Sequence, residues 1–78
     1  MGLKTTFANR LMTALYWSEM NMAQLSDRTG ITAASLSRYV NGKRHARADK
    51  LVAISKALNV SVDYLLGLSD DMGVDKKL

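Results

Sequence analysis

The most constraining feature of the sequence is the short connection Gly30-Ile31-Thr32 between two helical segments. The segment before it begins after Asn21, an N-cap type whose side chain can accept a hydrogen bond from a backbone N–H. It ends at a glycine, which can take the left-handed conformation that terminates helices. Thr32 is a second N-cap type. Because a connection of about three residues centred on glycine makes two helices cross steeply, the sequence predicts a helix-turn-helix over residues 22–41.

The rest of the chain also favours helices. It contains no proline and only five glycines in 78 residues, and its apolar residues recur at spacings of three and four. The expected fold is therefore all-α, a compact five-helix domain. The helices are expected over about residues 6–18, 22–29, 33–41, 47–58 and 62–66.

The predicted core consists of apolar residues that share the inward face of each helix. With 78 residues and no cysteine, the chain can bury one small core and has no disulfide to support it. Ser26 is small where the second and third helices should approach most closely. The predicted core residues are Phe7, Leu11, Ala14, Leu15, Ser18, Leu25, Ile31, Leu36, Tyr39, Leu51, Ile54 and Leu58.

Positive charge is concentrated in the middle of the chain. Residues 31–60 hold six basic and one acidic residue, whereas residues 1–30 have a net charge of +1 and residues 61–78 of −2. A local excess of this kind suggests a surface that faces a polyanion, although a solvated basic face would show the same charge. No membrane span or secretory signal is predicted, and we expect a cytoplasmic protein.

One face of the helix expected over residues 33–41 is free of the core. Short side chains at the leading end of such a helix let its backbone approach base edges in a major groove about 12 Å wide. Alanine can contact the thymine methyl group, serine can bond several base edges, and arginine can bind guanine. The high helix propensity of alanine is the alternative explanation for this composition. The residues that fall on this face are Ala34, Ser37, Arg38 and Asn41.

Two segments, NMAQLSDRTGITAASLSRYVNGKR and LVAISKALNVSVDYLLGLSD, resemble the Cro and lambda-repressor type of helix-turn-helix, also called the xenobiotic-response-element type. The resemblance covers about residues 7–68. It implies a lambda-repressor-like DNA-binding domain over residues 1–68, followed by a polar tail or linker over residues 69–78 that we expect to be disordered. The positions that carry it are Phe7, Arg10, Leu25, Ser26, Gly30, Asn41 to Lys43 and Ala57 to Leu66.

The resemblance also implies roles for individual residues. Many relatives have a glutamine where Met22 stands, and a glutamate that partners Arg10 where Val40 stands. Here Arg10 must pair elsewhere or turn toward DNA. The implied base contacts are Ala33, Ala34, Ser37, Arg38 and Arg44, and the implied phosphate contacts are Asn21, Met22, Asn41, Lys43 and Arg47.

The function implied by the resemblance is sequence-specific binding of double-stranded DNA by a transcriptional regulator. A phage-type repressor that occupies a palindromic operator as a homodimer is the leading hypothesis, with no cofactor, no metal and no enzymatic activity. The alternatives are a restriction-modification controller, an antitoxin-type regulator and a protein–protein adaptor on the same scaffold. An enzyme is least favoured because the carboxylates are scattered and form no Ser-His-Asp set.

Two apolar groups are candidates for contact with other protein chains. Relatives commonly dimerise through residues near the last helix, which points to Tyr64, Leu65, Leu66 and Leu68, although Leu65 is also expected in the core. Met12, Tyr16 and Trp17 lie away from the core face of the first helix, and we interpret them either as a partner surface or as residues partly covered by neighbouring helices.

Overall fold

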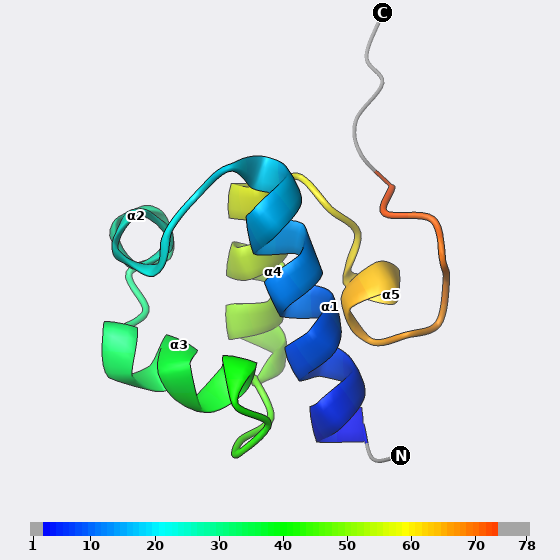
Figure 1. The fold of residues 1–78 in the computed structure, drawn as a ribbon, viewed down its shortest axis with the longest axis horizontal. Coiled ribbons are helices and arrows are strands. Elements are labelled where there is room, and N and C mark those ends of the chain that lie inside the picture. Colours follow the sequence, from blue (N-terminus) through cyan, green and yellow to red (C-terminus); the bar gives the residue numbers. More distant parts are fainter. Residues whose placement is uncertain (1–2, 74–78) are drawn as a thin grey trace, which may run out of the picture.

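Over the residues that the structure describes, the fold is a bundle of five α-helices, as predicted. The computed structural model describes residues 3–73, with side chains from Thr6 onward. Within this range none of the helices has both the length and the hydrophobicity needed to cross a membrane. The helices are α1 (Leu3–Ser18), α2 (Met22–Thr29), α3 (Ala33–Val40), α4 (Ala48–Leu58) and α5 (Val62–Leu65), shown in Figure 1.

The two ends of α2 are set by local hydrogen bonds that the sequence predicted. Asn21 Oδ1 accepts from the Gln24 backbone N–H at 2.8 Å, and Gln24 Oε1 accepts from the Asn21 N–H at 2.9 Å. This reciprocal pair satisfies two backbone donors that a helix start leaves without partners. At the other end Gly30 has φ 75°, and its N–H donates to the Ser26 carbonyl at 2.8 Å. The expected bounds of α2 are therefore confirmed.

Hydroxyl groups hold the short connection between α2 and α3. Ser26 Oγ donates to the Ile31 carbonyl at 2.6 Å, and Thr29 Oγ1 accepts from the Ile31 N–H at 3.1 Å. Thr32 Oγ1 then accepts from the Ser35 N–H at 3.1 Å and caps α3. Ser26 thus gives the closely packed region a small side chain and also fixes the path of the connection.

Besides the third helix, which ends at Val40 instead of about residue 41, three helix boundaries differ from the sequence expectation. The first helix begins at Leu3 instead of residue 6, because no proline or glycine interrupts the chain from Leu3 to Ser18. The fourth helix begins at Ala48 with Arg47 as its N-cap, and the fifth ends at Leu65. These last two differences are of one residue, which is within the fraying of helix ends.

The core joins all five helices. The largest fully buried side chains are Phe7, Leu11, Leu25, Leu36, Ile54 and Leu65. Each contributes about 1.5–3 kcal/mol by leaving water. The rings of Phe7 and Tyr39 lie 5.8 Å apart between centroids and link α1 to α3. The predicted core is confirmed except that Ser18 and Leu51 are only partly buried.

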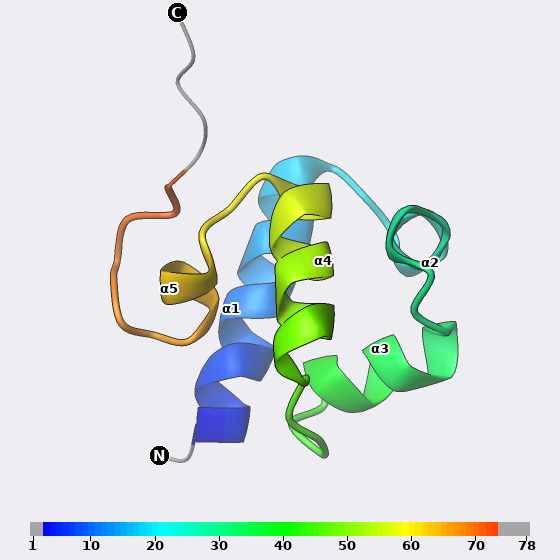
Figure 2. The same ribbon diagram turned by 180° about the vertical axis from the view of Figure 1, so that it is seen from behind.

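The helices are arranged around a central pair. Figures 1 and 2 show α1 and α4 side by side, with α2 and α3 on one side of them and α5 on the other. Because α2 and α3 are joined by a turn of three residues, α3 is held at the edge of the bundle with one face against α1.

Residues 69–73 pack against the bundle, so the expected disorder is wrong for this part of the tail. The Ser61 N–H donates to the Met72 carbonyl at 2.6 Å, and the Met72 side chain packs against the core. Arg10 donates to the Ser69 carbonyl at 3.0 Å. These contacts supply the anchoring that a polar composition alone does not reveal. Residues 74–78 lie outside the described part of the chain.

Two glycines with positive φ make a matched test of this backbone. Gly30→Ala should destabilise the domain by about 1–2 kcal/mol, because a left-handed residue with a Cβ is strained while the space around it is open. Gly67→Ala should lower the free energy of unfolding by more than Gly30→Ala does, because φ at Gly67 is 80° and the added methyl would lie 2.6 Å from Thr6 Cγ2. Urea unfolding of both variants measures the difference, and equal losses would contradict the close approach at Gly67.

Candidate nucleic-acid interface

The third helix has one buried and one exposed face, as predicted. Leu36 is fully buried and Tyr39 is 4% exposed, and both point into the core. Four residues of the helix are exposed, and we call them the reading face: Ala33, Ala34, Ser37 and Arg38. Three of these side chains are short, so the helix backbone can lie close to a surface placed against this face.

A basic loop, residues 43–47, continues from the end of α3 toward α4. The chain turns out of the helix at Gly42, which has φ 70°, and the Lys43 N–H donates to the Arg38 carbonyl at 2.9 Å. Lys43, Arg44 and Arg47 are all exposed. Within residues 3–73 neither these three cations nor Arg38 belongs to an ion pair, so their charges are available to a ligand.

The two residues predicted to contact phosphate at the start of α2 have few free hydrogen-bond donors. Asn21 is exposed, but its Oδ1 is engaged as the cap of α2. The Met22 side chain is half-buried and packs against the core. A thioether cannot donate a hydrogen bond. A contact from Met22 would therefore have to come from its backbone N–H, one of the donors that the start of a helix leaves without an intrahelical partner.

Asn41 makes an interaction that the sequence analysis missed. Its Nδ2 donates to the Ser37 carbonyl at 2.8 Å and to Ser37 Oγ at 3.3 Å. The spacing of four residues was the available signal, since residues four apart on a helix are neighbours. The predicted phosphate ligand and one predicted base contact are thus joined to each other.

Arg10 pairs within the protein. Its guanidinium lies 4.4 Å from the centroid of the Tyr64 ring, and Nη2 donates to Asp70 Oδ1 at 2.9 Å. Nη1 donates to the Ser69 carbonyl at 3.0 Å. Of the two expectations for this residue, the structure supports a partner elsewhere in the chain. Val40, which replaces the usual glutamate, packs against the core instead.

The predicted dimer contacts separate into buried and exposed residues. Tyr64 is 6% exposed and Leu65 is fully buried, so both belong to the core, as expected for Leu65 but not for Tyr64. Both are buried because α5 packs against α1 and α4. Leu66 is partly buried, whereas Leu68 is 74% exposed.

The apolar residues on the outside of α1 are largely exposed. The exposed fractions are 53% for Met12, 78% for Tyr16 and 68% for Trp17. The rings of Tyr16 and Trp17 pack edge to face with centroids 5.9 Å apart. Neighbouring helices therefore cover these side chains only in part, and an exposed apolar patch remains.

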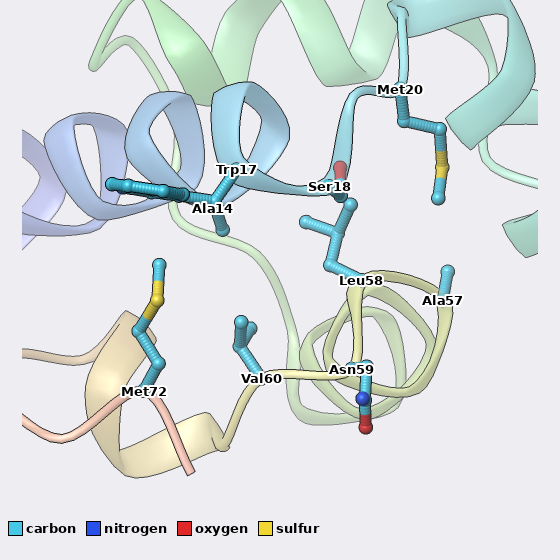
Figure 3. A pocket seen from close by; sticks show the side chains of 9 residues that line it. All are labelled: Ala14, Trp17, Ser18, Met20, Ala57, Leu58, Asn59, Val60 and Met72. Carbon is cyan, nitrogen blue, oxygen red and sulfur yellow. The ribbon is translucent and has the colours of Figure 1, made fainter. Parts of the chain in front are cut away.

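An open groove of about 320 Å³ lies where the C-terminal ends of α1 and α4 meet the segment after α5, as Figure 3 shows. It is at the far end of α4 from the basic loop, and an eleven-residue helix is about 16 Å long. The groove is therefore separate from the reading face. It is lined by Ala14, Trp17, Ser18, Met20, Ala57, Leu58, Asn59, Val60 and Met72.

Together these features define a DNA-binding helix-turn-helix domain. The profile of the helix-turn-helix family matches residues 17–65, which is more than half of the chain. The chain therefore belongs to the helix-turn-helix family of the Cro and lambda-repressor type, whose members are DNA-binding transcriptional regulators.

Two relatives of the chain are longer than it is. It is 35% identical over 65 residues to the uncharacterized HTH-type transcriptional regulator YobD of Bacillus subtilis (strain 168), a match that covers 83% of this chain and 58% of the relative. It is 29% identical over 75 residues to the 26 kDa repressor protein of Escherichia phage HK022, covering 91% of this chain and 32% of the relative. No solved structure gives a significant match. The chain thus spans between one third and three fifths of the relatives that it matches.

Arg10→Ala tests whether this guanidinium serves the fold alone. Because its hydrogen bonds are made inside the chain, the substitution should leave the slope of log affinity against log salt concentration unchanged on random duplex DNA. It should also speed amide exchange at Ser61, whose N–H depends on residues 69–73 staying in place. A slope reduced by about one would instead show that Arg10 neutralises a phosphate.

Proposed function

We propose that the protein is a repressor that recognises a specific double-stranded DNA sequence and blocks transcription by occupying it. The observation that carries this proposal is the position of the reading face directly beside the unpaired cations of the basic loop. A helix face of small residues suits the major groove, and cations next to it suit the phosphates on either side. The phage repressor among the relatives supports a repressor of phage type.

Some residues of the interface would contact bases and others the phosphate backbone of the DNA. Arg38 can bind guanine with two hydrogen bonds, and Ala33 and Ala34 can contact thymine methyl groups. Lys43 and Arg47 supply positive charge for phosphates, which fixes the register of α3 on the duplex. Arg44, at the start of the basic loop, extends the predicted base contacts beyond the helix.

We further propose that two copies bind a palindromic operator, with their α3 helices about 34 Å apart in successive major grooves. Leu68 is the candidate dimer contact that the structure leaves most exposed, with the partly buried Leu66 beside it. Symmetric use of one patch by both copies is the commonest form of dimer.

Selection of bound duplexes from a random DNA library tests the function directly. A repressor of this kind should enrich one sequence with two related half-sites, whose spacing reports the dimer. Binding to random duplexes should be detectable at low salt and fall steeply as salt rises. A protein–protein adaptor on the same scaffold would bind no duplex, whereas a restriction-modification controller or an antitoxin would enrich an operator and differ in the genes beside it.

Arg38→Ala and Lys43→Ala should separate base contacts from phosphate contacts. The first should weaken operator binding by about 1–3 kcal/mol and relax the preference at one base pair. The second should weaken operator and random DNA alike and reduce the salt slope by about one. Fluorescence anisotropy on both duplexes over a salt series provides the measurement. Equal losses on the two duplexes for both variants would contradict the assignment.

Leu68→Asp and Trp17→Ser compare the two exposed apolar regions as dimer contacts. If Leu68 lies in the dimer interface, a buried charge there should shift the protein toward a monomer and weaken operator binding. The Trp17 variant should sediment as the wild type does, and it controls for loss of an exposed apolar side chain. Sedimentation velocity with and without operator is the measurement, and the reverse result would move the interface to α1.

A further inference from the structure

The hydrogen bonds of Asn41 determine what its side chain can still do. The amide nitrogen of asparagine carries two hydrogens. In this structure Nδ2 donates to both the carbonyl and the hydroxyl oxygen of Ser37, at 2.8 and 3.3 Å. Its donors are therefore committed, and the atom left free is Oδ1, which only accepts. A phosphate oxygen is also an acceptor, so this side chain has no hydrogen left to offer a phosphate.

The backbone of the same turn is equally committed. The Asn41 N–H donates to the Ser37 carbonyl at 3.1 Å, the Gly42 N–H to the Tyr39 carbonyl at 3.1 Å and the Lys43 N–H to the Arg38 carbonyl at 2.9 Å. The backbone N–H groups of the turn between α3 and the basic loop are therefore all hydrogen-bonded within the protein. Phosphate contacts at this point are left to the exposed cationic side chains that follow it.

Ser37 is left with an uncommitted hydroxyl hydrogen. The residue is exposed on the reading face, its oxygen accepts from Asn41, and no acceptor within residues 3–73 takes its proton. A hydroxyl that accepts one hydrogen bond is polarised and becomes a better donor. The acceptors on base edges in the major groove are guanine O6 and N7, adenine N7 and thymine O4.

We infer that Asn41 is a positioning residue, which holds Ser37 so that its hydroxyl donates to a base acceptor in the major groove and which makes no phosphate contact itself. This inference rests on the proposed function and adds to it the kind of base edge that Ser37 recognises. It also gives Asn41 a role different from the phosphate contact that the sequence resemblance implies.

Ser37→Ala, Asn41→Ala and the double variant test the inference on the intact chain. Each single variant should lose about threefold to tenfold in operator affinity, as for one hydrogen bond, and keep its affinity for random duplex DNA. The double variant should bind the operator no more weakly than Ser37→Ala, because Asn41 acts through Ser37. Thr13→Ala, which removes an exposed hydroxyl from α1, is the matched control and should bind as the wild type does.

Operators that lack one acceptor at a time identify the partner of Ser37. Suitable bases are 7-deazapurines for N7, 2-aminopurine for guanine O6 and 5-methyl-2-pyrimidinone for thymine O4. The wild type should lose affinity at one position where Ser37→Ala shows no further loss, and Asn41→Ala should show a reduced loss there. Circular dichroism melting shows whether each variant is folded. If Asn41→Ala does not fold, Asn41→Ser replaces it in the same experiments.

The outcomes that overturn the inference are distinct from those that overturn the function. An Asn41 variant that weakens operator and random DNA equally would show a phosphate contact and overturn the positioning role. A Ser37→Ala protein that loses affinity at every acceptor position as the wild type does would overturn the base contact. Both results leave an operator-binding protein. Failure of the wild type to enrich any sequence would overturn the proposed function and this inference with it.

Discussion

The left-handed backbone at Gly30 is the constraint on which the interface depends. It ends α2 and, with the Ser26 hydroxyl bound to the Ile31 carbonyl at 2.6 Å, directs the chain into α3 after three residues. Such a short path permits only a steep crossing. With α2 packed on the core through Leu25, the direction of α3 follows, and so does the side of it that stays in water.

The eight residues of α3 must then both pack against the core and form the reading face. Leu36 and Tyr39 anchor α3 in the core, and few positions remain for recognition. Two of these are alanines, which offer methyl groups and no hydrogen bonds. Under the proposed function, direct hydrogen-bond recognition from the helix would depend on Ser37 and Arg38, and part of the specificity would come from thymine methyl contacts or from the shape of the DNA.

The parts of the structure that the sequence predicted well are those decided within one helical turn. Caps such as Asn21 and Thr32 act on backbone groups three residues away, and each was found where expected. Arg10 shows the opposite case, because its partners Ser69 and Asp70 are 59 and 60 residues away. No sequence signal near Arg10 identifies these partners. They lie beside Arg10 only because α5 brings the segment after it to α1. The division of α3 into two faces was predictable. The hydrogen bonds that leave each polar group with or without a free donor or acceptor were not.

The distribution of charge follows from the same arrangement. The segment after α5 carries Asp70 and Asp71 and is anchored by Arg10 on the side of the bundle opposite α3, as Figures 1 and 2 show. The unpaired cations of α3 and the basic loop lie on the other side. A domain with opposite charges on opposite sides is oriented by the field of a polyanion before contact, which favours encounters that place the reading face first. Arg10 contributes to this arrangement by holding the acidic segment far from the interface, while its own charge offsets that of Asp70.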